Sequence, residues 1–319
     1  MEFRLITRWR LKTIFQTFVV LTCVSFLVFA FVFEKLKAES NHSLSGPIKI
    51  GVDTSEIYRY ANTNFHNEKL NYYTYLPNKV NDSMQVMFVM HGTDRNAMDY
   101  LNAWKDFADA NNYLIVAPAF LEVVKDESFD YQEGNVWGQN HVWNNKEDWA
   151  FVTVERIFSE LVSNNALVAD SFLIFGHSAG AQFVHRMVLF MPESHIKMAF
   201  AANAGWYTFP NYEEKFPYGL MNTSIKDQTL SMAFQKKLFV LLGEEDKAKD
   251  HLRQTKNANK QGKTRVARGS KFFNFSREKA KSHQIVFNWQ SMVIKHAAHN
   301  YILMSKEAQE IILKRKDDM

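Results

Sequence analysis

The sequence has very little of the residue types that form covalent or metal cross-links. Its 319 residues include one cysteine, Cys23, which lies in an apolar stretch near the N-terminus. The rest of the chain therefore has no disulfide, no thiol nucleophile and no cysteine metal site. No group of histidines and carboxylates has the spacing of a zinc site either. We expect neither a metal nor a cofactor, and we expect the hydrophobic core to provide the stability.

An excess of one charge is also lacking. The formal net charge is only +4, and part of it comes from four cations before the apolar stretch: Arg4, Arg8, Arg10 and Lys12. So small an excess gives no reason to expect a nucleic-acid partner. With 46% hydrophobic and 23% charged residues, the composition is that of a globular protein. The length allows one large domain or two.

The N-terminal apolar stretch, residues 14–33, predicts a transmembrane helix. A bilayer core takes about 20 apolar residues to cross. The cations in residues 1–13 favour a cytoplasmic N-terminus, with the rest of the chain on the other side of the membrane. A cleaved signal peptide stays open and would make the protein secreted, although such peptides usually have only about 7–15 apolar residues. Lipid attachment at Cys23 is disfavoured because the apolar run continues beyond it.

The remainder of the chain divides into a tether and one domain. Residues 34–47 are polar and poor in core-forming side chains, as in a linker. Over residues 48–319 strands alternate with helices, which predicts an α/β domain with a mostly parallel sheet and helices on both faces. The expected strands include residues 48–52, 71–76, 85–90, 113–117, 198–202, 237–242 and 284–289, and the expected helices include residues 96–111, 149–161, 181–190 and 301–313.

The pentapeptide Gly176-His177-Ser178-Ala179-Gly180 is the feature around which this domain is organised. A run of strand formers precedes it, and apolar residues at helical spacing follow it. That order predicts strand, sharp turn and helix, which is the nucleophile elbow of the α/β-hydrolase fold. The two glycines leave room for the tight turn, so that Ser178 projects at its tip and can attack a carbonyl. The alternative is an ordinary turn in which the serine only caps the helix.

The acid that would support this serine should follow it in the chain. In this fold the order is serine, acid, histidine, and each of them lies in a loop at the same edge of the parallel sheet. Asp246 follows a buried strand and a glycine, and it is our candidate. Its role would be to orient the imidazole and stabilise the imidazolium. Glu244, Glu245 and Asp250 are rivals in the same loop.

The candidate general base is His299, which lies beyond the last strand and directly before the final helix. It would take the proton of Ser178 and pass it to the leaving group. His296, three residues earlier, stays open as an alternative. Ordinary polar roles are expected for three other histidines: His177, His185 and His283.

Two backbone amides are candidates for the oxyanion hole. The amide of Ala179 lies at the start of the helix and points at the forming oxyanion. The second donor should come from the loop after the strand at residues 85–90, where we choose Thr93. Gly92 lets this backbone approach the substrate closely.

Two further features carry expectations about surfaces. The region of residues 120–148 has no steady period, and a loop this long in a compact domain is more often functional. We expect the aromatic loop at residues 129–143 within it, together with a second loop at residues 206–218, to wall the substrate pocket. A basic segment over residues 257–282 contains Arg265, Arg268 and Lys271, and we expect it to be a solvated face.

Several segments besides the pentapeptide form a recognisable combination. They are His91-Gly92-Thr93 with Arg95-Asn96-Ala97, residues 176–186, Asn203-Ala204-Gly205-Trp206-Tyr207, Phe216-Pro217-Tyr218-Gly219, Gly243-Glu244-Glu245-Asp246, and Gln261-Gly262 with Arg265 and Arg268. In these segments the chain resembles the α/β-hydrolases grouped with polyhydroxybutyrate depolymerase-like and feruloyl esterase-like proteins. The resemblance implies hydrolysis of carboxylic esters through an acyl-enzyme, and it supports Ser178, Asp246 and His299 as the matching catalytic positions.

The sequence therefore predicts a membrane-tethered serine hydrolase that acts outside the cytoplasm on an ester of a small or medium acyl or aryl group. A peptidase or amidase with the same three residues stays open as an alternative. So does a catalytically inactive domain of this fold that serves as a binding module, although the presence of all three residue types at the expected places argues against it.

Overall fold

The structure is a computed structural model, and it describes residues 57–61, 69–78, 83–120, 128–138, 141–165 and 167–315. The predicted transmembrane segment, the linker and the expected strand at residues 48–52 lie outside these ranges, and the predicted segment boundaries stay predictions. Among the described residues, no helix combines the length and the apolar character needed to cross a membrane.

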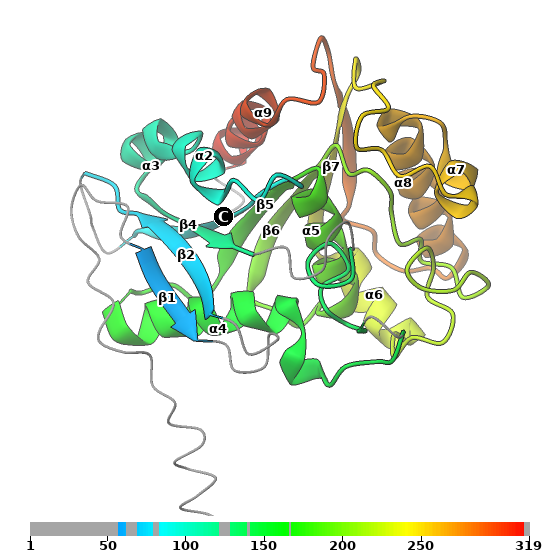
Figure 1. Ribbon diagram of the computed structural model, residues 1–319, viewed down its shortest axis with the longest axis horizontal. Coiled ribbons are helices and arrows are strands. Elements are labelled where there is room, and N and C mark those ends of the chain that lie inside the picture. Colours follow the sequence, from blue (N-terminus) through cyan, green and yellow to red (C-terminus); the bar gives the residue numbers. More distant parts are fainter. Residues whose placement is uncertain are drawn as a thin grey trace, which may run out of the picture. The chain divides into compact units, whose positions relative to one another are not determined.

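A single sheet organises the described residues (Figure 1). Its strand order is β1-β2-β4-β3-β5-β6-β7-β8. β2 pairs antiparallel with β1 and β4, and every other neighbouring pair is parallel. The predicted mostly parallel sheet is confirmed. The strands are β1 (Ile57–Ala61), β2 (Lys69–Tyr75), β3 (Gln85–Met90), β4 (Tyr113–Ala119), β5 (Phe172–His177), β6 (Ile196–Ala202), β7 (Lys237–Gly243) and β8 (Gln290–Ile294).

Helices cover both faces of this sheet, as predicted (Figure 1). One face carries α2 (Ala97–Asn102), α3 (Lys105–Asn111) and α9 (Tyr301–Lys314). The opposite face carries α4 (Ala150–Asn165), α5 (Ala179–Phe190) and α8 (Arg265–Ser282), with α6 (Asp227–Gln235) beside α5 and α7 (Lys256–Gln261) beside α8. A short 3-10 helix, η1 (Lys146–Asp148), precedes α4.

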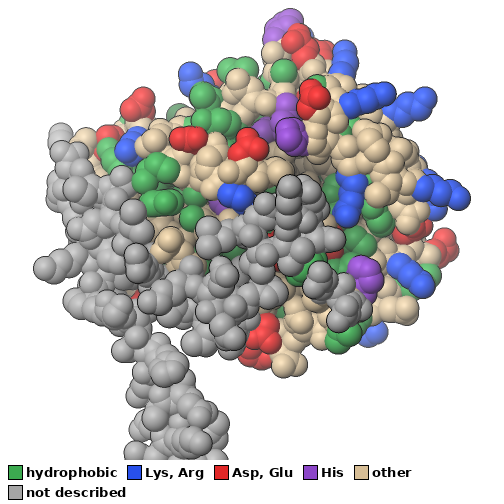
Figure 2. All heavy atoms as spheres, viewed as in Figure 1, with side chains coloured by type: hydrophobic (Ala, Val, Ile, Leu, Met, Phe, Trp, Pro, Cys, Tyr) green, Lys and Arg blue, Asp and Glu red, His purple; other side chains and the backbone are tan. Residues whose placement is uncertain are grey.

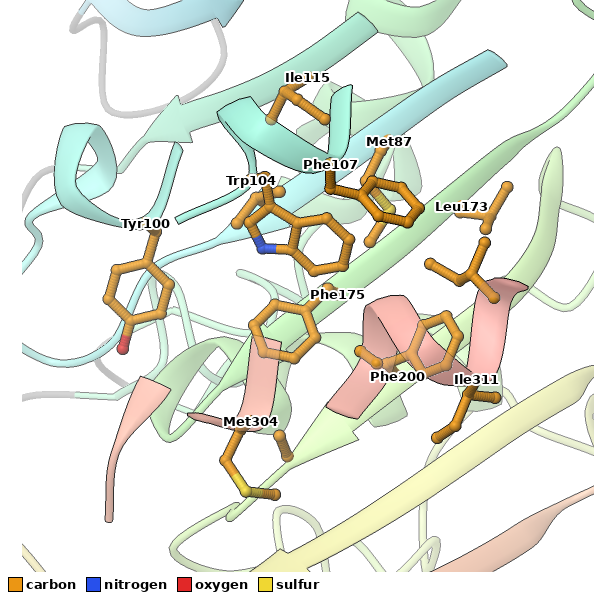
Figure 3. Close-up of a cluster of buried hydrophobic side chains, with 14 of the residues drawn as sticks. Met87, Tyr100, Trp104, Phe107, Ile115, Leu173, Phe175, Phe200, Met304 and Ile311 are labelled. Atoms are coloured by element: carbon orange, nitrogen blue, oxygen red, sulfur yellow. The ribbon is translucent and has the colours of Figure 1, made fainter. Parts of the chain in front are cut away.

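The core on the first face is built around Trp104 (Figure 3). Its indole ring is fully buried and lies 5.3 Å from the ring of Phe175 and 5.6 Å from that of Phe107, between centroids. Met304 and Ile311 of α9 close the cluster from the C-terminal end of the chain. Burial on this scale fixes α9, and therefore the loop before it, against the sheet.

Two expected elements differ from the structure. The single helix expected over residues 96–111 is two helices. The helical path is interrupted between α2 and α3, and this interruption places Trp104 in the core. The strand expected at residues 284–289 is wrong, and β8 begins at Gln290. The segment before it is bound to the end of α6, where the Asn288 amide N–H donates to the Phe234 carbonyl and the Trp289 indole N–H to the Ala233 carbonyl.

Candidate active site

The turn between β5 and α5 has the geometry that the pentapeptide predicts. Ser178 has a φ of 57° and a ψ of −113°, a strained conformation that costs about 1–3 kcal/mol. A Cβ atom on Gly176 would lie 2.3 Å from the Gly180 carbonyl, and one on Gly180 would lie 2.3 Å from the Met90 carbonyl oxygen. Backbone packs directly on backbone here, so both positions require glycine.

The acid and the base predicted from chain order lie side by side. Nδ1 of His299 donates to Oδ2 of Asp246 at 2.7 Å, and the Asp246 side chain is fully buried. This bond occupies one ring nitrogen and leaves Nε2 free to face the other way. The rivals lie in solvent. Asp250 is exposed, and so is His296, whose Nδ1 lies 3.5 Å from Glu245 and whose backbone N–H donates to Glu244 at 3.4 Å.

Asn203 fastens the two loops that carry this pair. It follows β6 with a φ of 53°. Its Oδ1 accepts from the Gly243 amide at 2.7 Å, and its Nδ2 donates to the Ala298 carbonyl at 3.2 Å. A third link runs from the Glu245 amide to the Ala297 carbonyl at 2.9 Å. The sequence contained Asn203 directly after an expected strand, but its role depends on loops about 40 and 95 residues away.

Arg265 is a second partner of the acid. Its Nη1 donates to Oδ1 of Asp246 at 3.1 Å and to the Ala248 carbonyl at 3.0 Å, and its Nη2 donates to the Asp250 carbonyl at 2.6 Å. Both carboxylate oxygens of the acid are therefore bound, one by the imidazole and one by a guanidinium, and such charge-assisted bonds fix its orientation.

The burial of two arginines contradicts the expected solvated face at part of residues 257–282. Arg265 and Arg268 are both buried, and Arg268 donates to the carbonyls of Gly262, Gly205 and Arg253. The two residues are three apart and so share the inner face of α8. Lys271 is exposed as expected, and it belongs to the cations that gather over α7 and α8, as Figure 2 shows, together with Lys256, Lys260 and Arg277.

His177 and Tyr100 form the floor beneath the base. The Tyr100 hydroxyl and Nδ1 of His177 are 2.9 Å apart, and the rings of His177 and His299 lie 4.5 Å apart between centroids. Burial lowers the pKa of His177 well below its usual value, so this ring is neutral. Burial also raises the pKa of Tyr100, which keeps its proton and stacks on Tyr301 at 4.3 Å.

The loop after β3 lies next to the nucleophile. A Cβ atom on Gly92 would be 3.8 Å from Cβ of Ser178 and 2.7 Å from the Tyr100 hydroxyl oxygen. His91 pins this loop, because its Nδ1–H donates to the Gly92 carbonyl and its Nε2 accepts from the Phe120 amide. Burial lowers the pKa of His91 to about 3, so it too is neutral.

These residues enclose a pocket of about 130 Å³. The lining includes the predicted nucleophile and base together with Thr93, and its aromatic wall is formed by Tyr100 and Tyr301. Ala179 is the first residue of α5, directly after Ser178. Among the described residues there is no group of three or more histidine, cysteine, aspartate or glutamate side chains that could hold a metal ion.

No described residue of the two aromatic loops lines this pocket, contrary to our expectation. They line a separate and wider cavity of about 630 Å³, to which they contribute Phe129, Trp137, Phe216 and Tyr218. The physical reason is a hydrogen bond that holds the first loop against the residue that follows β3: the Tyr131 hydroxyl donates to the His91 carbonyl at 2.9 Å. Its tip then packs on the second loop, with the rings of Trp137 and Phe216 4.8 Å apart.

Comparison with known proteins fits this geometry. No protein-family model and no curated protein matches the sequence, but solved structures do. Poly(aspartic acid) hydrolase-1 from Sphingomonas sp. KT-1 is 33% identical, with a TM-score of 0.74, and the match covers 77% of this chain and 94% of that one. The chain belongs to the α/β-hydrolase superfamily.

A second relative of this hydrolase places it in the same group. LpqC, a poly(3-hydroxybutyrate) depolymerase from Bordetella parapertussis, is 28% identical, with a TM-score of 0.76 over 80% of this chain and 88% of that one. The predicted resemblance to depolymerase-like hydrolases is therefore confirmed. An S-formylglutathione hydrolase from Agrobacterium tumefaciens, 14% identical with a TM-score of 0.56 over 84% of this chain and 98% of that one, shares the fold.

Proposed function

We propose that this α/β-hydrolase cleaves carboxylic esters through an acyl-enzyme on Ser178. The observation that carries the proposal is the 2.7 Å bond between His299 and the buried Asp246, in a protein whose strained Ser178 lines the same pocket as that histidine. A nucleophile, a base and an acid that orients the base are the parts that acyl transfer requires.

In the proposed reaction, Nε2 of His299 takes the proton of the Ser178 hydroxyl as its oxygen attacks the ester carbonyl. The amides of Thr93 and Ala179 stabilise the oxyanion, and His299 then protonates the departing alcohol. Water, activated by the same imidazole, releases the acid in the second step. Asp246 stays ionised throughout, and we propose that Arg265 holds it in place.

We also propose that the enzyme is tethered to a membrane by residues 14–33, with the domain of residues 48–319 on the periplasmic or extracellular side. The support is the length of the apolar run and the cations before it. The partners proposed are a small-molecule ester and the lipid bilayer.

The test uses the full-length chain in detergent and a fluorophosphonate probe, which labels an activated serine. We expect the parent to be labelled and to hydrolyse para-nitrophenyl esters, and we expect Ser178→Ala and His299→Ala to lose both properties. The matched controls are Ser163→Ala and His283→Ala, which remove the same side chains from exposed positions and should behave as the parent does.

A folded parent that is neither labelled nor active would overturn the proposal and favour a binding module. Matched para-nitroanilides distinguish the enzyme classes. Turnover of anilides at a rate comparable with the esters would make the protein an amidase.

A further inference from the structure

The small pocket and the wider cavity are neighbours along one segment of the chain. His251 lines the pocket at Ser178, and Arg253 lines the wider cavity. Two residues span at most about 7 Å. The pocket of about 130 Å³ is smaller than the roughly 300–1,000 Å³ of most ligand sites, whereas the cavity of about 630 Å³ falls within that range. The pocket has room for the reacting group and the cavity has room for the rest of a substrate.

Glu133 holds the wall of the cavity in one arrangement. Its buried carboxylate accepts from the Ser128 hydroxyl and from the Trp137 indole N–H, each at 2.5 Å, and lies 3.6 Å from Nη1 of Arg253. One carboxylate thus fixes three side chains that line the cavity. A binding surface that is already ordered loses little entropy when a ligand arrives.

Arg253 has donors left over in this arrangement. Its guanidinium lies over the Trp206 ring, 4.7 Å from the centroid, and its Nη1 donates to the Ser128 hydroxyl at 3.2 Å. Within the described part of the chain, its Nη2 and Nε have no hydrogen-bond partner, and the side chain is 31% exposed. A planar guanidinium with free N–H groups is suited to a carboxylate.

The other lining residues favour the same kind of ligand. Glu133 is the one carboxylate among the described lining residues, and its oxygens are occupied. Lys215 adds a second, exposed cation, and Trp137 and Phe216 add apolar surface to the lining. A ligand with an apolar body and an anionic end matches this lining.

We propose that the wider cavity binds a carboxylate on the substrate, so that the preferred substrate is an ester that also carries a free acid group, with Arg253 as its recognition residue. The inference rests on the proposed function, because it requires the ester carbonyl to lie at Ser178. The carboxylate can belong to the acyl part or to the alcohol part of the ester, and the test distinguishes the two.

The test compares kcat/KM for matched acidic and neutral esters on the full-length protein. The acyl pair is mono-para-nitrophenyl glutarate and its methyl-capped diester. The alcohol pair is the butyrate ester of para-hydroxybenzoate and that of its methyl ester. We expect about a tenfold preference for the acidic member of one pair, the size of a single charge-assisted contact. That pair identifies the part of the substrate that enters the cavity.

Arg253→Gln should remove this preference, and Arg253→Lys should retain part of it. Arg277→Gln makes the same change at an exposed position on α8 and should leave the preference as in the parent. A second measurement needs no variant: glutarate should inhibit the parent enzyme about tenfold more strongly than glutaramide does.

Failure of the inference differs from failure of the proposed function. If no ester of either pair is hydrolysed, the proposed function fails. If the esters are hydrolysed but neither pair shows a preference, or if Arg253→Gln lowers the rates for acidic and neutral esters equally, the carboxylate site is wrong and the esterase proposal stands. Equal inhibition by glutarate and glutaramide would also contradict the site.

Discussion

The pocket at Ser178 and the wider cavity are held in shape by different kinds of contact. Around Ser178 the walls are fixed by close backbone packing, because Gly176 and Gly180 let strand, turn and helix touch. The side chain of Asn203 adds bonds to the backbone of the two loops that carry Asp246 and His299. The wider cavity is fixed by side chains, above all by Glu133. Backbone packing therefore sets the position of Ser178, whereas the lining of the wider cavity depends on a few side chains that can be replaced one at a time.

The largest effect is expected where backbone meets backbone. Gly180→Ala would place a Cβ atom 2.3 Å from the Met90 carbonyl oxygen and 2.8 Å from that of His91. We expect the free energy of unfolding to fall by at least about 2 kcal/mol and ester hydrolysis to be lost. Urea unfolding and initial rates measure the two effects.

The matched control lies in the first aromatic loop, which lines the wider cavity. In Gly138→Ala the nearest described atom to the new Cβ would be Asn144 Oδ1, at 3.7 Å, so we expect stability and activity close to the parent values. If the two alanine variants lost similar amounts of stability and activity, close backbone packing would not distinguish the pocket at Ser178 from the wider cavity.

The next largest effect concerns the acid. Asp246→Asn keeps the shape of the side chain but removes the charge that orients and stabilises the imidazolium, so kcat should fall by roughly a thousandfold or more. Asp250→Asn, the same change at the exposed rival, should leave kcat within about twofold, the range expected of a surface substitution. If Asp250→Asn gave the larger loss, the acid would be misassigned.

Acidification should lower the free energy of unfolding, because two buried histidines near Ser178 stay neutral in the folded protein. His177 lines the pocket at Ser178, and His91 precedes the loop residue Gly92 that lines it. Both histidines are buried, and burial lowers the pKa of His91 to about 3 and that of His177 well below its usual value. Because the unfolded chain takes up protons below about pH 6.5 while the folded protein does not, stability is fully present above that pH. Each ring should remove about 1.4 kcal/mol at pH 5.5.

Urea unfolding at pH 7 and pH 5.5 measures this loss. In His91→Gln the pH-dependent loss of stability should be smaller by the contribution of one imidazole ring. His141→Gln, at an exposed position on the wider cavity, should leave this loss unchanged. An identical pH dependence in the parent and in His91→Gln would contradict the assignment of a neutral buried ring.

The smallest effect is expected in the wider cavity. Glu133→Gln removes the charge that holds Ser128, Trp137 and Arg253, so we expect kcat/KM to fall about fivefold for esters that reach the cavity and less for para-nitrophenyl acetate. Glu147→Gln, an exposed change nearby in the chain, serves as the control. If kcat/KM fell equally for large and small esters, the wider cavity would not act independently of the pocket at Ser178.

The sequence revealed the parts of the site that depend on neighbouring residues. The elbow is local, because strand formers, two glycines and a helical stripe lie within 20 residues, and β3 was predicted at its observed bounds. The roles of Asn203 and Arg265 could not be predicted, since both depend on contacts between distant loops. Helical spacing alone did not show that Arg265 and Arg268 face inward. An ion pair with Asp246 allows Arg265 to be buried, and hydrogen bonds to backbone carbonyls allow Arg268 to be buried.

The wall of the nucleophile pocket was missed for a similar reason. Tyr100 and Tyr301 stack although about 200 residues separate them, and they meet because α2 and α9 cover the same face of the sheet. The aromatic loops were assigned to this pocket from their position in the chain, whereas the hydrogen bond of Tyr131 to His91 directs the first loop into the neighbouring cavity.

The most direct measurement is the identification of the acylated residue. The full-length enzyme is mixed with a para-nitrophenyl ester, quenched in acid during turnover, digested and analysed by mass spectrometry. We expect the acyl group on the peptide that contains Ser178, and no acylated peptide in Ser178→Ala. Steady hydrolysis without acylation of Ser178, or an acyl group on another residue, would contradict the account.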